Sequence, residues 1–182
     1  MVCPWWIGYL LVSPLRRLVQ DPRAILSPWV KDGMTVLEPG PGMGFFTLEL
    51  ARLVGPRGRV VAVDLQPRML AGLTRRAGKA GLIERLETRQ APSRGLGVGD
   101  LAARVDFALA FAMVHEVEDQ DLLFAELSAA LKPGGALLLA EPAGHVREVD
   151  FAATLTRADR AGLHPASRPT IWRSHAAVLI KG

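Results

Sequence analysis

Cysteine is nearly absent from this sequence, because Cys3 is the only one among 182 residues. A single cysteine excludes a disulfide within the chain, and no Cys/His cluster has the spacing of a zinc site. We therefore expect no bound metal and a reducing, cytoplasmic setting. Long apolar runs are also missing. The apolar stretch 3–15 is too short to span a bilayer, lacks a basic leader and contains Pro4 and Pro14, so we expect no stable membrane insertion.

A long basic run is missing as well, although the net charge is +4 and the pI is about 9.8. The arginines fall in short pairs such as Arg75 and Arg76, with Lys79 one helical turn further on. No aromatic residues for base stacking are interleaved with them. A solvated helix face explains this pattern better than a phosphate-binding stripe, so we expect no nucleic-acid partner.

The chain is long enough for one domain with a sizeable core, and alternating strand and helix patterns indicate an α/β protein. We expect a single domain over 1–182, with an N-terminal helical cap at 1–30 and a core at 31–182. Strands are predicted at Thr35 to Glu38, Arg59 to Asp64, about Ile83 to Arg89, Val105 to Ala112, Ala136 to Glu141, and, as an antiparallel hairpin, Pro165 to Ile171 and Arg173 to Ile180. Helices are predicted at Ser13 to Val19, Asp21 to Val30, Phe45 to Val54, Arg68 to Ala80, Asp119 to Leu131 and Val146 to Ala161.

The most informative segment runs from Val36 to Thr47, where an apolar stretch is followed by three glycines at alternate positions. Its pattern is acid-x-G-x-G-x-G, beginning at Glu38, whereas dinucleotide-binding loops have G-x-G-x-x-G. An NAD-dependent dehydrogenase is therefore disfavoured. Glycines let the backbone approach a ligand closely and adopt positive φ. Asp64 ends the next predicted strand, where a carboxylate can hold both hydroxyls of a ribose.

These segments, with the strand Val105 to Ala112 and the phrase Leu131 to Leu137, resemble the class I methyltransferases that depend on S-adenosylmethionine (SAM). The resemblance covers about residues 22–181. It implies a Rossmann-like three-layer sandwich whose seven-stranded, mostly parallel sheet has the order 3-2-1-4-5-7-6 and an antiparallel last strand. It also implies SAM as the cofactor.

The resemblance assigns contacts along this cofactor. Glu38 pairs with the ammonium group of SAM, Asp64 accepts hydrogen bonds from the ribose hydroxyls, and Leu65 offers an apolar face to the adenine. Many family members carry an acid for the adenine amino group just after the third strand, and here Gln90, Ser93 or the backbone alone takes its place. The predicted cofactor-binding residues are Glu38, Gly40, Gly42, Gly44, Asp64, Leu65, Gln90 and Ala112.

The segment Ala112 to Val117 follows the fourth strand, at the edge where ligands of such sheets bind. It resembles small-molecule O-methyltransferases in which a His-Asp pair stands here and the histidine takes a proton from a hydroxyl. His115 matches that histidine, and Glu116 replaces the aspartate. An imidazole suits this proton transfer, so His115 is the predicted catalytic residue. Substrate or cofactor contact without proton transfer, and packing of the loop, are the alternatives.

Residues 3–11 hold two of the four tryptophans and the only tyrosine. Such large rings must be buried somewhere, as a hydrophobic lid over the substrate, as packing on the core, or at a membrane interface.

We expect a small-molecule methyltransferase, either a monomer or a homodimer. The alternatives are an RNA or protein methyltransferase and a SAM-binding protein without catalysis. The fourth strand does not end in the Asn-Pro-Pro-Tyr or Asp-Pro-Pro-Tyr motif of many N-methyltransferases.

Overall fold

The structure is a computed structural model that describes residues 20–182. The chain divides into two compact units, Met1–Ser93 and Arg94–Gly182, called unit 1 and unit 2 below. The predicted helix Ser13 to Val19 and the aromatic segment 3–11, with its lid hypothesis, lie outside the described residues.

Unit 1 contains three parallel strands in the order β3-β2-β1. Its strands are β1 (Thr35–Pro39), β2 (Arg59–Asp64) and β3 (Leu86–Gln90), and its helices are α3 (Pro22–Leu26), α4 (Thr47–Leu53), α5 (Pro67–Lys79) and the 3-10 turn η1 (Ile83–Arg85). The strands β1 and β2 are nearly continuous apolar runs, and Val36, Leu37 and Val61 have no exposed surface. Such runs are typical of parallel strands that are buried on both faces.

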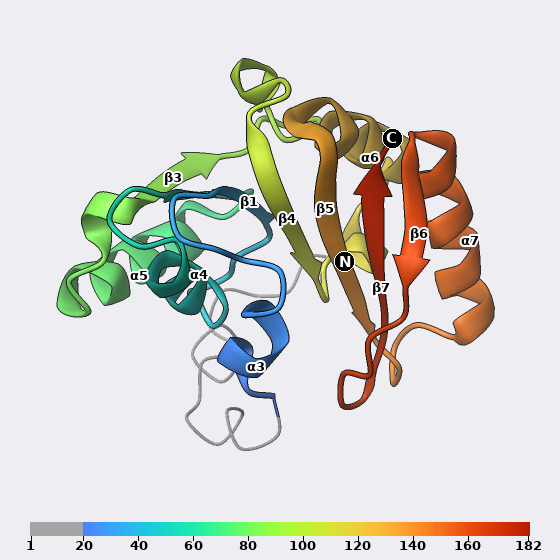
Figure 1. The fold of residues 1–182 in the computed structure, drawn as a ribbon, viewed down its shortest axis with the longest axis horizontal. Coiled ribbons are helices and arrows are strands. Elements are labelled where there is room, and N and C mark those ends of the chain that lie inside the picture. The colour runs from blue at the N-terminus through green and yellow to red at the C-terminus, as the bar shows by residue number, and fades with distance from the viewer. Residues whose placement is uncertain (1–19) are drawn as a thin grey trace. The chain divides into compact units, whose positions relative to one another are not determined.

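Unit 2 contains four strands in the order β4-β5-β7-β6. Its strands are β4 (Val105–Phe111), β5 (Leu131–Pro142), β6 (Leu163–Ser167) and β7 (Ser174–Lys181), and its helices are α6 (Gln120–Ala130), α7 (Glu148–Arg160) and the 3-10 turns η2 (Gly99–Leu101) and η3 (Val114–Glu116). β4 and β5 are parallel, whereas β7 is antiparallel to both of its neighbours. In Figure 1 the arrows of β6 and β7 point in opposite directions, and α7 packs along β6.

The complete strand order is β3-β2-β1-β4-β5-β7-β6, with β7 antiparallel. This is the predicted order, and the prediction of a Rossmann-like α/β fold is confirmed. In such a fold, the carboxyl ends of the parallel strands carry the ligand-binding loops. The segments that follow β1, β2, β4 and β5 are therefore the candidates for ligand binding.

Several predicted elements were displaced or too long. The helix expected over Asp21 to Val30 ends at Leu26, and residues 27–29 form a turn, because Pro28 has no N–H to continue the helical hydrogen bonds. The third strand starts late, since Ile83–Arg85 form a 3-10 turn. The predicted strand Pro165 to Ile171 is instead Leu163–Ser167, where Pro165 is tolerated because β6 is an edge strand.

The fifth strand begins earlier than predicted. The phrase 132–135, expected as a turn before it, lies within β5. It is accommodated by an irregular register with β4, in which Val105 pairs with Leu131 and the ladder resumes with Phe107 opposite Ala136. A local irregularity of this kind keeps the apolar residues of both strands in the core.

Two loop glycines provide a matched test of local packing. Gly44 has φ +85°, and a Cβ there would lie 2.4 Å from Cδ1 of the fully buried Leu73 on α5. Gly42 also has positive φ, +54°, but a Cβ there would meet nothing within 4 Å. We expect Gly44→Ala to lower the free energy of unfolding by about 1–3 kcal/mol more than Gly42→Ala, since only the first overpacks the core. Urea unfolding of both variants checks this, and equal losses would contradict it.

Candidate active site

The glycine loop 40–44 follows the carboxyl end of β1. The Gly40 N–H donates to the Val63 carbonyl of β2 at 2.8 Å, and the Gly44 N–H closes a turn on the Pro41 carbonyl at 3.0 Å. Gly40, Gly42 and Gly44 all have positive φ, a conformation that glycine adopts without strain. The first two therefore serve the loop's conformation, and Gly44 additionally permits close packing on α5.

Glu38 places a carboxylate in the core immediately before this loop. Its exposed fraction is 4%, and Thr47, beside it, has none. Within the described residues, neither Glu38 Oε2 nor Thr47 Oγ1 makes a hydrogen bond of good geometry, although the hydroxyl lies close enough to favour the ionised carboxylate. Burial outweighs that effect and raises the pKa of Glu38 to about 8, and the nearby Asp64 carboxylate adds to the increase. At neutral pH this buried group therefore holds its proton.

Asp64, at the end of β2, organises the neighbouring backbone. Its Oδ2 accepts the Gly42 N–H at 3.3 Å and its Oδ1 accepts the Gln66 N–H at 2.8 Å. A carboxylate offers about four lone-pair sites, which is more than these two hydrogen bonds use. Leu65 follows with 51% of its surface exposed, and Gln90 lies opposite Asp64 in the β2–β3 register. Unit 1 thus brings Glu38, the glycine loop, Asp64, Leu65 and Gln90 to one edge of its sheet, and this set fits a nucleoside with an ammonium group.

Arg76 differs from the solvated helix face that the sequence predicted for α5. Its Nη1 donates to the Met43 carbonyl of the glycine loop, and the residue is half-buried. Arg75 and Lys79 are exposed, as expected. The sequence pattern could not separate these residues, because the Arg76 contact joins positions that are distant along the chain.

His115 lies in unit 2, in the turn η3 after β4. Its Nδ1 is hydrogen-bonded to Glu141 Oε2, and its side chain is 30% exposed. Glu141 ends the apolar part of β5 and is 1% exposed. Its Oε1 accepts the backbone N–H groups of Met113 and Val114 at 3.2 and 2.8 Å. The buried carboxylate therefore fixes both the loop and the orientation of the imidazole.

This arrangement can move a proton. A neutral imidazole that donates through Nδ1 to a carboxylate presents the lone pair of Nε2, and the carboxylate stabilises the imidazolium that forms when Nε2 takes a proton. Ala112, the other predicted residue of this segment, follows β4 directly. It has φ +55°, and its N–H donates to the Ala140 carbonyl at 2.7 Å.

Sequence reasoning missed Glu141. The resemblance suggested Glu116 as the acid beside His115, whereas the imidazole is hydrogen-bonded to Glu141. A signal was present, because Glu141 ends an apolar strand and so stands at the same edge of the sheet as the end of β4. The prediction considered strands one, two and four, and did not extend the rule to strand five.

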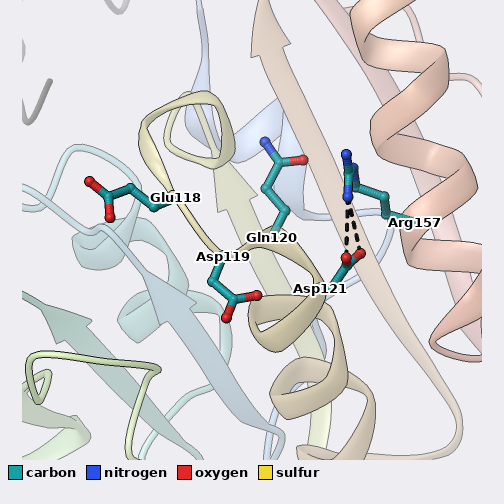
Figure 2. Close-up of a pocket in the computed structure, with 5 residues that line it drawn as sticks. All are labelled: Glu118, Asp119, Gln120, Asp121 and Arg157. Carbon is teal, nitrogen blue, oxygen red and sulfur yellow. Dashed lines mark hydrogen bonds and ion pairs between the residues drawn. The ribbon is translucent and has the colours of Figure 1, made fainter.

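A cleft of about 440 Å³ lies at the start of α6, and His115 is not among the residues that line it. Figure 2 shows its lining residues Glu118, Asp119, Gln120, Asp121 and Arg157. Asp121 pairs with Arg157 of α7 at 3.2 Å. Asp119 caps α6 through the Leu122 N–H and pairs with Arg94, and these contacts lower its pKa. Both carboxylates are thus already paired within the described residues, and the Gln120 amide donates to the Val114 carbonyl at 3.1 Å.

A family model described as a methyltransferase domain matches residues 30–170. The chain belongs to this family. Its fold is that of the class I, SAM-dependent methyltransferases. Within residues 20–182, none of the helices of this methyltransferase has the length and apolar character needed to cross a membrane.

Curated relatives of the methyltransferase match part of its length. The ubiquinone/menaquinone biosynthesis C-methyltransferase UbiE of Pasteurella multocida is 31% identical over 112 residues, which are 62% of this chain and 41% of the relative. The protein of the same name from Teredinibacter turnerae is 33% identical over 112 residues, 62% of this chain and 44% of the relative. The chain therefore spans less than half the length of these relatives.

Solved structures match over more of the chain. A SAM-dependent methyltransferase from Aquifex aeolicus superposes with a TM-score of 0.87 over 100% of both chains, at 22% identity. A SAM-dependent O-methyltransferase from Thermotoga maritima gives a TM-score of 0.68 over 88% of this chain and 64% of that one, at 21% identity. At these identities the similarity concerns the fold.

Proposed function

We propose that this methyltransferase binds SAM through unit 1 and methylates a small molecule that loses a proton to His115 of unit 2. The bound SAM supplies an electrophilic methyl group on its sulfonium. The cofactor contacts are those predicted from the sequence, with the buried carboxyl group of Glu38, whose Oε2 makes no hydrogen bond within the described residues, as the partner of the ammonium. The observation that carries the proposal is the hydrogen bond between His115 and Glu141, because it fixes the imidazole as an oriented proton acceptor.

A base that removes a proton can activate two kinds of methyl-accepting atom. A hydroxyl oxygen becomes nucleophilic when it loses its proton, and an aromatic carbon beside a hydroxyl becomes nucleophilic when that hydroxyl ionises. The relatives named as ubiquinone/menaquinone biosynthesis C-methyltransferases support the second kind, with a phenol-like ring as the acceptor. In either case the S–CH₃ bond breaks as the new bond to the methyl carbon forms, so alignment is the main demand on the protein.

The cofactor half of the proposal is tested by replacing Asp64. Asp64→Ala should weaken SAM binding by on the order of 1.5–3 kcal/mol, since hydrogen bonds to a charged group are lost. Asp32→Ala is the matched control, because Asp32 is an acid of the same unit that pairs with Arg57 before β1. Calorimetric titration of both variants and the wild type with SAM, S-adenosylhomocysteine and NAD measures the effect.

Two results of this titration would contradict the proposed cofactor contacts. Tight binding of NAD without a response to SAM would reject the SAM site. Unchanged SAM affinity in Asp64→Ala would place the ribose contact elsewhere. A screen of small phenols, thiols, amines and quinol-like compounds with radiolabelled SAM then identifies the acceptor, and the absence of methyl transfer to all of them would favour SAM binding without catalysis.

A further inference from the structure

The turn between β6 and β7 lies at the same edge of unit 2 as the His115–Glu141 pair. β7 runs antiparallel to β5, so its first residues are paired with the last residues of β5, and His175 lies opposite Glu141. The Ala143 N–H donates to the Arg173 carbonyl at 3.0 Å. These contacts place Trp172 and Arg173 at the edge of the unit 2 sheet that also carries His115, the proposed base. This edge is called the rim below.

Trp172 and Arg173 form an exposed pair on this rim. The exposed fraction of Trp172 is 53%, and the Arg173 guanidinium lies over its ring, 5.3 Å from the centroid. A guanidinium that lies over an aromatic ring at this distance still has five N–H donors, more than the ring uses, and these suit a carboxylate or phosphate. The pair therefore offers an aromatic surface and a set of directed donors side by side.

Arg173 differs from its basic neighbours. Arg147 pairs with Asp150 at 2.6 Å and Arg168 pairs with Glu148 at 3.2 Å. Among residues 20–182, no carboxylate forms an ion pair with Arg173. The charge of Arg173 is thus available to a ligand, whereas Arg147 and Arg168 are paired with carboxylates of the same unit.

The backbone at Arg173 is also unusual. Its φ is +54°, a left-handed conformation that residues with a Cβ rarely adopt. The hydrogen bond from the Ala143 N–H and an antiparallel β-bridge between Ile171 and Ser174 hold this conformation. Backbone strain that the surroundings maintain is concentrated at ligand-binding positions.

We propose that Trp172 and Arg173 form an acceptor subsite for a compound that combines a planar aromatic ring with an anionic group, either a carboxylate or a phosphate. The ring packs against Trp172, the anion accepts hydrogen bonds from Arg173, and the ionisable hydroxyl is directed to the rim that carries His115. This inference rests on the proposed function, because it names the class of acceptor for that same site.

Calorimetry with three matched compounds tests the subsite without requiring methyl transfer. The compounds are 4-hydroxybenzoate, 4-hydroxyphenyl phosphate and the neutral 4-hydroxybenzamide. We expect the wild type to bind at least one of the two anions about tenfold more tightly than the amide, because hydrogen bonds to a charged group are involved. Arg173→Gln should remove this preference, and the preferred anion reports whether the natural group is a carboxylate or a phosphate.

Arg104→Gln is the matched control. Arg104 is an exposed arginine of the same unit that precedes β4 and so stands at the opposite end of that strand from His115. This variant should keep the preference for the anion, and unfolding midpoints like that of the wild type show that both variants are folded. Because the left-handed conformation disfavours most side chains, Arg173→Asn, which tolerates it, is measured alongside and should also lose the preference.

Three results would overturn the subsite. They are equal affinity of the wild type for anions and amide, retention of the preference in both Arg173 variants, and Arg173-dependent binding to phosphatidylglycerol vesicles without a preference among the small compounds. The last result would assign Arg173 to a lipid surface. Failure of the proposed function is distinguishable, since it appears as absent SAM binding in the Asp64 experiment while the anion preference is measured without SAM.

Discussion

Replacing His115 by alanine should lower the turnover of saturated enzyme by about 10²–10⁴-fold, because this is the usual contribution of a positioned general base. SAM affinity should remain nearly unchanged, since none of the predicted cofactor contacts of unit 1 is removed. Calorimetry for SAM binding and single-turnover methyl transfer to an identified phenolic acceptor separate the two effects. A histidine that only packs the loop would instead reduce stability and leave the turnover of folded enzyme almost intact.

Glu141→Gln examines the positioning of this base. The amide retains the shape of the carboxylate but cannot stabilise an imidazolium as a charge does, so we expect turnover to fall while SAM affinity is kept. Glu148→Gln is the matched control, because Glu148 also pairs with a histidine, His175, at 2.7 Å, yet is exposed. A normal rate in Glu141→Gln, or an equal loss in both variants, would remove the role of Glu141 in orienting the base.

A thiol acceptor provides a second contrast. A thiol ionises more readily than an ordinary hydroxyl and needs less help from a base. If the best acceptor is a thiol and His115→Ala methylates it normally, His115 belongs to the packing of the loop. The general-base assignment would then be wrong, whereas SAM binding by unit 1 would stand.

The sequence predicted the elements that depend on local pattern. The loop from Glu38 to Gly44 could be recognised because its glycines and its acid are close neighbours in the chain, and strand order followed from the resemblance. Glu141 could not be paired with His115, since 26 positions separate them and only the alignment of β4 with β5 brings them together. The contact of Arg76 with the Met43 carbonyl was missed for the same reason.

Edge elements were also hard to predict. β6 has one buried residue, Leu163, followed by four exposed ones, so the alternation that reports a half-buried strand is absent. Ala112 was assigned to the end of β4 but lies beyond it with left-handed backbone. Nothing in its residue type indicates such a conformation, which the surrounding hydrogen bonds impose.

The free energy of unfolding should depend on pH through Glu38. The pKa of this group rises from 4.5 to about 8 on folding, so between these values the folded protein holds a proton that the unfolded chain has released. The free energy of unfolding contributed by this group therefore falls as pH rises from about 4.5 to 8, by at most about 5 kcal/mol. Glu38→Gln should flatten this dependence, and urea unfolding from pH 5 to pH 8 measures it.

Binding of SAM should depend on pH in the opposite direction. An ammonium is stabilised by the ionised carboxylate, so at neutral pH Glu38 must release its proton when SAM binds. From pH 5.5 to 7.5, below the pKa of about 8, SAM affinity should rise by up to about tenfold per pH unit. Calorimetry in two buffers that differ in ionisation enthalpy should detect the release of nearly one proton per SAM at pH 7.

Glu38→Gln separates this linkage from other titrations, because the amide is isosteric and has no proton to release. In this variant SAM should bind more weakly than to the wild type at pH 7.5, with an affinity almost independent of pH from 5.5 to 7.5. Adenosine, which has no ammonium group, is the control ligand, and its affinity for the wild type should not rise with pH in this window. A flat profile for SAM in the wild type, with no proton released, would mean that Glu38 does not face the ammonium and that its buried carboxyl group stays protonated in the complex.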